Sequence, residues 1–242
     1  MNVGDLLRGL SYGELRHLFV GMSGAGTIAD GEKDRLVFLA DQALKQIYSR
    51  VPHNLHYVTL QTSASRKVYP IRPVHRVSDQ SLSNTADRFI MDSANDPFTG
   101  QLLKIRSVRV MFDPTNPDAD PANLLLNDTA SGHVRTVSYD TLRIDTPIEG
   151  ALFELELQMA HVPLTLPADL TQTIEIIPLL EEALFAKVAH SVFAGMGGEE
   201  SLVKAQNLNN RYEALLTNVV MEDLAQQSSS HEDSRLMTNG WI

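Results

Sequence analysis

Two glycine-rich patterns near the N-terminus resemble motifs of functional sites, one a nucleotide-binding loop and the other the turn that holds a catalytic serine. Gly24-Ala25-Gly26-Thr27-Ile28-Ala29 matches the dinucleotide-binding fingerprint in its alanine variant. That loop holds a pyrophosphate only where it joins a strand to a helix, and residues 11–20 have a helical pattern instead. Gly21-Met22-Ser23-Gly24-Ala25 lacks the last glycine and the strand of a nucleophile elbow. We therefore expect a connection between helices here.

Histidines and acidic residues are the next candidates, for metal binding. His53 and His56 are three residues apart, but Pro52 and the apolar alternation that follows predict an extended chain, which points them to opposite sides. His190 is expected to pack within a helix. The loop at 113–120 is rich in oxygen ligands but lacks the central glycine and the later glutamate of an EF-hand loop. A turn fixed by Pro and Asp is favoured over a calcium site.

Glu154, Glu156 and His161 could be placed in the cleft of a hydrolase. However, glutamates at alternate positions of a strand are also typical of a solvated sheet face. The chain has no cysteine, which excludes thiolate catalysis and thiolate metal sites. We expect no enzyme, no catalytic residue, no cofactor and no metal, and keep a metal-free hydrolase as a less favoured alternative.

The sequence also contains a basic cluster. It consists of Arg66, Lys67, Arg72, His75 and Arg76, interleaved with apolar residues. Such a cluster suits a nucleic-acid contact or an interface with acidic groups of a neighbouring subunit. The formal net charge of −10 favours the second interpretation. We name Arg66, Lys67, Arg72 and Arg76 as candidate subunit-interface residues.

The composition is that of a soluble globular protein with a sizeable core. The chain has 242 residues, 43% of them hydrophobic. No segment has the roughly 20 consecutive apolar residues of a membrane span, and the N-terminus has no secretory signal pattern. We expect the chain to act in a cytoplasm, without a membrane partner. Its negative charge argues against coating DNA but is compatible with a conduit through which DNA slides.

Helices are expected in the N-terminal segment. Ser11 and Glu14 match a capping box, which would start a short helix that ends at residue 20. A second helix is expected over residues 31–50, with Pro52 enforcing its end. Its buried face would consist of Leu36, Leu39, Ala40, Ala43 and Ile47.

The middle of the chain changes to a period of two, which is typical of strands. The clearest strand is expected over 151–159, with an apolar face and a mostly charged face. Further strands are expected over residues 55–62, 89–92, 103–112 and 134–139. Because turns rich in Pro and Asn separate them, we expect an antiparallel sheet.

The C-terminal segment predicts a helical hairpin. Pro178 suits the first turn of one helix, and Gly195, Gly197 and Gly198 suit its end. A second helix is expected over 199–225. The apolar residues of its buried face would be Leu202, Ala205, Leu208, Tyr212, Leu215, Leu216 and Val219.

A polar tail with an apolar tip follows the hairpin. Residues 226–233 cannot bury enough apolar surface to fold alone. The apolar residues after them, Leu236, Met237, Trp241 and Ile242, are costly to leave in water. This pattern predicts a tether that docks onto a partner.

The fold class predicted by these elements is α+β. Both terminal segments would form one helical bundle, with an antiparallel β-rich domain, sandwich-like or barrel-like, inserted between them. The expected parts are N-terminal helices over 1–52, the β-rich insertion over 53–164, the helical hairpin over 165–227 and an extended arm over 228–242.

Four features spread over the whole chain support a resemblance to a known family. They are the opening helices at 15–20 and 36–48, the run Ile174-Glu175-Ile176-Ile177-Pro178-Leu179-Leu180-Glu181-Glu182-Ala183-Leu184, its continuation Ala186-Lys187-Val188-Ala189, and the ending Gly240-Trp241-Ile242. With these features the chain resembles the head-to-tail adaptor, or connector, proteins of tailed bacteriophages.

The resemblance implies a structural protein of the virion. A ring of subunits, expected to be a dodecamer, would dock beneath the portal protein and join it to the tail tube or nozzle. DNA would pass through its channel without specific binding, and assembly would occur in the host cytoplasm. The resemblance also implies that the arm reaches the portal through Arg235, Leu236, Met237, Trp241 and Ile242. A soluble scaffold that docks peptides is the alternative.

Overall fold

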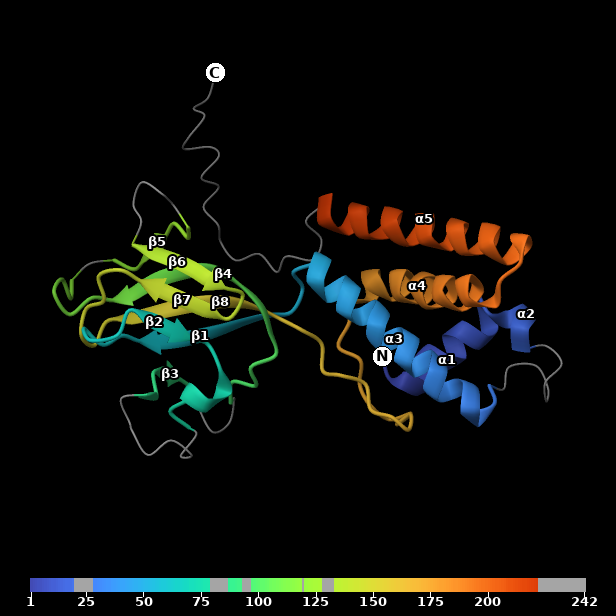
Figure 1. The fold of residues 1–242 in the computed structure, drawn as a ribbon, viewed down its shortest axis with the longest axis horizontal. Coiled ribbons are helices and arrows are strands. Elements are labelled where there is room, and N and C mark those ends of the chain that lie inside the picture. Colours follow the sequence, from blue (N-terminus) through green and yellow to red (C-terminus); the bar gives the residue numbers. More distant parts are fainter. Residues whose placement is uncertain (20–27, 79–86, 93–96, 119, 128–132, 222–242) are drawn as a thin grey trace, which may run out of the picture. The chain divides into compact units, whose positions relative to one another are not determined.

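The computed structural model describes residues 1–19, 28–78, 87–92, 97–118, 120–127 and 133–221. The chain divides into two compact units, one made of residues 1–53 with 162–242 and the other of residues 54–161. Both terminal segments therefore belong to the same unit, which is helical, and the second unit contains the β-strands (Figure 1). The predicted α+β class is confirmed.

The helical unit contains five described helices. Among them, α4 packs against α1, α3 and α5. Their bounds are α1 Val3–Tyr12, α2 Arg16–Phe19, α3 Asp30–Arg50, α4 Pro178–Met196 and α5 Glu199–Met221. Among the described residues, no helix combines the length and apolarity that crossing a bilayer requires.

Helix α1 begins earlier than the sequence pattern predicted. Asn2 caps it, accepting a hydrogen bond from Asp5 N at 2.7 Å, and the Asp5 carboxylate completes the capping box. Ser11 lies in the last turn, where its Oγ donates to Arg8 O at 2.9 Å. The expected start at Ser11 was wrong because Val3, Leu6, Leu7 and Leu10 already have the spacing of a buried helical face.

The first residues of the chain also pair with the segment that precedes α4. Val3 N donates to Gln172 O and Gly4 N donates to Leu170 O, both at 3.0 Å, and Ile174 N donates to Met1 O at 2.8 Å. These backbone bonds join the N-terminal part of the bundle to its C-terminal part. The N–H groups of Val3 and Gly4, in the first turn of α1, have no partner within the helix and are satisfied by these bonds.

The predicted helices α3 and α4 and the predicted hairpin between α4 and α5 are confirmed. Pro178 is in the first turn of α4, and Gly197 and Gly198 follow it with φ of 70° and 85°. The buried residues of α5 are Ala205, Leu208, Tyr212, Leu216 and Val219. Leu202, predicted to be buried, is 54% exposed. It lies in the first turn of α5, so only the very end of α4 could cover it.

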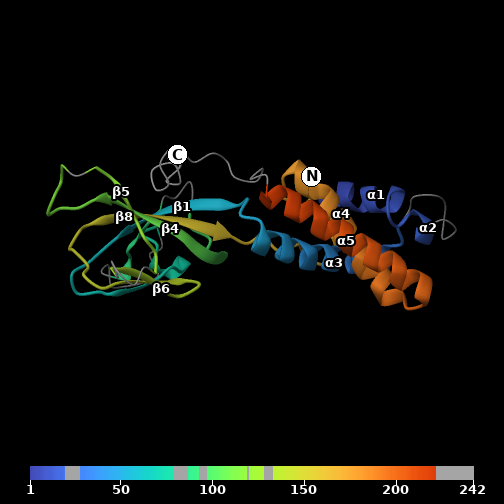
Figure 2. The same cartoon turned by 90° about the horizontal axis from the view of Figure 1, so that it is seen from above.

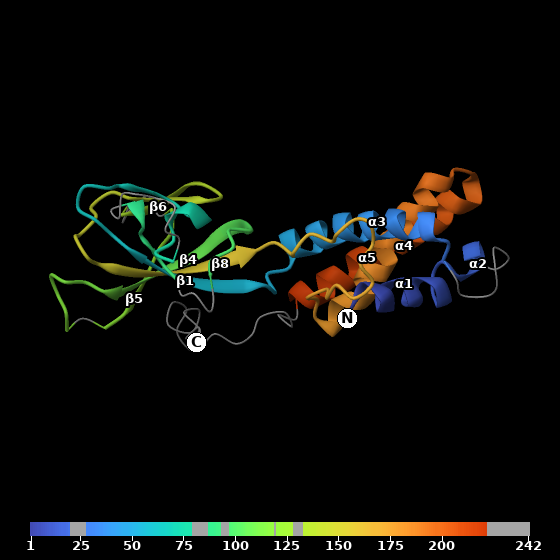
Figure 3. The same cartoon turned by 90° about the horizontal axis from the view of Figure 1, so that it is seen from below.

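The β unit has two antiparallel sheets around one core. The larger has the order β3-β1-β8-β4-β5 and the smaller β2-β7-β6. Figures 2 and 3 show β1, β4 and β8 in one layer and β6 in another. Their bounds are β1 Leu55–Gln61, β2 Val68–Pro70, β3 Ile90–Met91, β4 Leu102–Phe112, β5 Ala122–Leu124, β6 Val134–Ser138, β7 Thr141–Ile144 and β8 Leu152–Met159.

The core of this unit forms between the two sheets. Val58 and Leu155 from the larger sheet and Tyr69 and Leu142 from the smaller one belong to the same buried cluster. The described strands make a sandwich, without a closed barrel. On the other face of the larger sheet, Thr59, Glu154 and Arg109 lie opposite one another across β1, β8 and β4. This face has the polar pattern predicted for β8.

Candidate functional site

Helix α5 has an outer face without charge. Its buried residues all point into the bundle, and the opposite side of the helix is exposed. Between Val203 and Met221, the exposed charged residues Lys204 and Arg211 lie to one side of a row of exposed residues without charge, which is opposite the buried side of the helix. The row consists of Val203, Gln206, Asn207, Asn210, Ala214, Thr217, Asn218 and Met221. We call them the neutral face of α5. Exposed helix faces ordinarily carry charges, so a neutral one needs a reason.

The charged residues in the body of α5 contact other groups of the bundle, although Lys204 and Arg211 stay exposed. Arg211 Nε donates to Glu182 Oε1 at 2.9 Å, and the same guanidinium contacts Glu14. Glu213 accepts from Arg50 Nη1 at 2.9 Å. Lys204 Nζ lies 4.9 Å from the centre of the Phe193 ring. These contacts are made inside the helical unit, which leaves amides and small side chains to face outward.

The chemistry of the neutral face is that of amide groups. Gln206 Nε2 donates to Asn210 Oδ1 at 3.0 Å, one helical turn away. Amides both donate and accept hydrogen bonds, but they release no counterions from a phosphate backbone, so they do not hold DNA electrostatically. This surface can lie beside DNA or protein without a strong electrostatic preference. Sequence analysis missed it, although the spacing of Asn207, Asn210 and Asn218 was visible.

The predicted basic cluster lies in the β unit, where its arginines have acidic partners. Arg66 pairs with Asp87 and lies over the ring of Phe89. Arg72 Nε donates to Asp140 Oδ2 at 2.9 Å. A hydrogen bond from Ser138, together with those from Arg72 and Thr141, lowers the pKa of Asp140.

Arg76 extends this pattern. Arg76 Nη1 donates to Phe98 O at 3.1 Å, and Arg76 Nε lies 3.9 Å from Asp92 Oδ2. Lys67 is exposed. The three arginines therefore stabilise loops of their own unit, and a role of Arg66, Lys67, Arg72 and Arg76 at a subunit interface stays a prediction.

The acidic residues considered for hydrolysis have structural contacts. Glu156 Oε2 accepts from Ser107 Oγ at 2.7 Å, and its other oxygen lies 3.6 Å from Arg106 Nη1. Glu154 lies on the same face of β8, opposite Thr59. His161 is buried at the end of the unit. The contacts of Glu156 are those of a residue that stabilises the sheet.

Two histidines, His53 and His190, are likewise packed against their own unit. His53 Nδ1 lies 3.1 Å from Val51 O, and its ring contacts Tyr48 edge to face. Burial lowers the pKa of His53. His190 Nδ1 lies 2.9 Å from Ala205 O, so it joins α4 to α5, as a packing residue would. Among the described residues, no three His, Cys, Asp or Glu side chains form a group that could hold a metal ion.

The acidic loop after β4 forms a turn of the expected kind. Asp113 Oδ1 accepts from Thr115 N at 2.8 Å and from Thr115 Oγ1 at 2.7 Å. The hydrogen bonds from Thr115 lower the pKa of Asp113. The first carboxylate of the loop thus fixes the backbone of its own turn.

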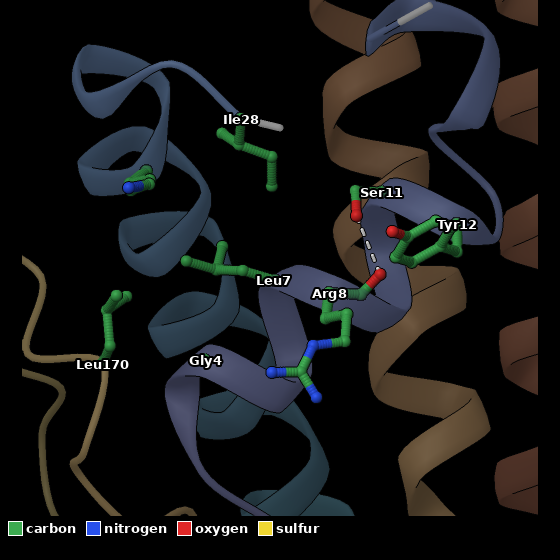
Figure 4. Close-up of a pocket in the computed structure, with 8 residues that line it drawn as sticks. Gly4, Leu7, Arg8, Ser11, Tyr12, Ile28 and Leu170 are labelled. Atoms are coloured by element: carbon green, nitrogen blue, oxygen red, sulfur yellow. Dashed lines mark hydrogen bonds between the residues drawn. The ribbon is translucent and has the colours of Figure 1, made fainter. Parts of the chain in front are cut away.

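A pocket of about 240 Å³ lies beside α1 and the start of α3 (Figure 4). Its cations have partners, since Lys33 Nζ lies 2.7 Å from Asp30 and Arg8 lies 3.6 Å from Asp5. The Ser11 hydroxyl donates to a backbone carbonyl. The lining residues are Gly4, Leu7, Arg8, Ser11, Tyr12, Ile28, Lys33 and Leu170. They do not form a nucleophile with a base.

Two other predictions lie outside the described residues. One concerns the glycine-rich segment with Ser23, and the other the docking arm with Arg235, Leu236, Met237, Trp241 and Ile242. No protein-family model matches the chain, and no curated protein matches it in sequence. Assignment of function therefore depends on the elements and surfaces described above.

Proposed function

We propose that the chain is a head-to-tail adaptor of a tailed bacteriophage, a structural protein without enzymatic activity. Its subunits would form a ring, expected to be a dodecamer, between the portal protein and the tail tube or nozzle. The observation that carries the proposal is the division of the chain, in which both terminal segments build one helical unit and the strands form an insertion between residues 53 and 162. The order of helices and strands in the sequence predicted this arrangement, and the resemblance to adaptor proteins rests on helices from both terminal segments.

The neutral face of α5 supports this function. DNA that passes through a channel is slowed by cations, which hold phosphates, and is repelled by carboxylates at short range. The neutral face of α5, between Val203 and Met221, would present neither to the DNA. The formal charge of −10 likewise suits a protein that lets DNA pass without binding it.

The two alternatives have less support from the described residues. A hydrolase would require Glu154 or Glu156 to act on a substrate, but Glu156 is held by Ser107 and Arg106. A scaffold that docks peptides would require a groove. The pocket beside α1, at about 240 Å³, is smaller than the roughly 300–1,000 Å³ that is usual for sites of small ligands.

Electron microscopy of the purified chain mixed with the portal protein encoded near its gene tests the proposal. The expected result is a ring that caps one end of the portal and continues its channel. The chain alone and the portal alone serve as controls. Free portal beside unattached subunits, at concentrations where docking should saturate, would contradict the adaptor function.

A further inference from the structure

A half-buried lysine joins α4 to α5. Lys187 Nζ donates a hydrogen bond to Asn209 Oδ1 at 3.2 Å and lies 4.8 Å from the centre of the Tyr212 ring. Both partners belong to α5, and Tyr212 is buried. In the described part of the chain, no carboxylate oxygen lies within ion-pair distance of Lys187 Nζ. The ammonium group therefore has neutral partners at close range.

The carboxylate in the surroundings of Lys187 is held by an arginine. Arg50 Nη1 donates to Glu213 Oε1 at 2.9 Å, and Arg50 Nη2 lies 2.8 Å from Glu213 Oε2. Both oxygens of Glu213 thus have a guanidinium partner. Arg50 and Lys187 carry two positive charges and Glu213 one negative charge, which leaves this group of three side chains with a net charge of +1.

These surroundings favour the neutral amine over the ammonium ion. Burial lowers the pKa of Lys187, and the positive charge of Arg50 adds to this effect, while the carboxylate of Glu213 opposes it. A lysine that is shielded from water beside a second cation is a stronger nucleophile at neutral pH, because more of its amine is unprotonated.

The other five lysines of the chain have different surroundings. Lys33 Nζ lies 2.7 Å from Asp30, and Lys45 Nζ lies 2.6 Å from Asp41, so both ammonium groups have a carboxylate partner. Ion pairs of this kind favour the charged, unreactive form. The remaining three, Lys67, Lys104 and Lys204, are exposed. Lys187 alone combines burial, neutral close partners and a neighbouring arginine.

We propose that Lys187 is a site of acylation by small acyl phosphates. The neutral Nζ attacks the carbonyl carbon of the donor, and the new N–C bond forms as the C–O bond to phosphate breaks. The phosphate leaves with the electrons of that bond, and the nitrogen gives one proton to solvent. The product is a neutral amide, which removes the cation that lies over the Tyr212 ring. This site is independent of the adaptor function.

Acetyl phosphate is the probe, since a half-buried amine admits a donor of this size. The folded full chain is incubated with it at about pH 8, and mass spectrometry of peptides gives the acetylation rate at each lysine. We expect Lys187 to react at least about threefold faster than the exposed Lys104 and Lys204. In urea, where the chain is unfolded, this preference should disappear. A rate at Lys187 in the folded chain that is no higher than at Lys104 would overturn the proposal.

Two variants separate charge from access to the amine. Arg50→Gln should slow the acetylation of Lys187, because a cation is lost and Glu213 is free to pair with the ammonium group. Glu213→Gln should speed it, because the opposing carboxylate is lost. Glu32→Gln, at the other end of α3, removes a carboxylate that pairs with Arg35 and should leave the rate as it is. If Arg50→Gln and Glu213→Gln shift the rate in the same direction, access and not charge governs the reaction, and the proposal fails.

Discussion

Arg50 and Glu213 join the two ends of the chain within the helical unit. Arg50 Nη1 donates to Glu213 Oε1 at 2.9 Å, and Arg50 Nη2 lies 2.8 Å from Glu213 Oε2, so the pair is bidentate. One residue ends α3 and the other belongs to α5, although 163 residues separate them. The ring of Tyr212 lies beside the same guanidinium. A bundle made of both terminal segments is thus tied at this point by one ion pair.

Glu213→Gln should lower the free energy of unfolding at neutral pH by about 0.5–1 kcal/mol, since the pair is partly exposed and screened by solvent. The hydrogen bond from Arg50 lowers the pKa of Glu213 in the folded chain. The contribution of the ion pair is therefore fully present above the unfolded pKa and is lost as pH falls through the folded one. Urea unfolding at several pH values measures this.

The wild type and Glu213→Gln should converge in stability at acid pH. Glu175→Gln, a change at an exposed position of the same unit, is the control and should leave the pH dependence as it is. A stability difference that stays constant down to acid pH would mean that packing, not the charge of Glu213, is responsible.

Gly100→Ala and Gly150→Ala should differ in cost although both positions have a left-handed backbone, with φ of 78° and 76°. The strain of that backbone costs about 1–2 kcal/mol at either site. A Cβ at Gly100 would lie 2.3 Å from Cγ of Pro73, whereas one at Gly150 meets nothing within 4 Å. Overpacking should add about 1–3 kcal/mol at Gly100 alone. Equal unfolding midpoints for the two variants would show that the loop at Pro73 yields without cost.

The long elements of the fold could be predicted because their apolar residues repeat regularly over many positions. Helix α3 and strand β8 each follow one apolar period over most of their length. Strands β2 and β5, of three residues each, are too short to show a period of two, and they pair with distant segments that the local sequence does not reveal. The capping pattern at Ser11 likewise predicted a helix start that the apolar spacing of α1 contradicts. Because Leu6 and Leu10 are buried, the helix begins before Ser11.

The candidate surfaces were harder to predict, because a cluster in sequence does not show its partners in space. Arg66 and Arg72 resemble a free basic patch, yet Asp87 and Asp140, which pair with them, lie 21 and 68 residues away. Arg135 and Arg143 are the opposite case, because they are separate in sequence and become neighbours only through the pairing of β6 with β7.

Deletion of residues 236–242 should abolish docking to the portal while the fold stays intact. The sequence predicts an apolar tip there on a polar tether, and apolar side chains such as Trp241 are stabilised when a partner covers them. Cosedimentation with the portal measures docking, and urea unfolding checks the fold. Ser228→Ala with Ser229→Ala, in the polar part of the arm, should dock normally. A truncated chain that still binds the portal would remove the docking role from Leu236, Met237, Trp241 and Ile242.

Lysines on the neutral face of α5 should slow the release of DNA if this face lines the channel of the proposed adaptor. In Asn207→Lys with Asn210→Lys and Asn218→Lys, each added cation contacts one phosphate of the DNA. The resulting binding weakens as salt rises, because the logarithm of the binding constant falls with the logarithm of the salt concentration, with a slope of about −0.9 per contact. Genome ejection from particles that carry the variant, timed at several salt concentrations, measures the effect. The matched control places three lysines on the outer side of α3, as Gln42→Lys with Gln46→Lys and Ser49→Lys, where all three positions are exposed. Slow, salt-sensitive ejection in the α5 variant alone would support a channel-lining α5. Equal ejection rates in both variants would mean that the neutral face of α5 lies away from the DNA, and that its lack of charge serves a contact with protein.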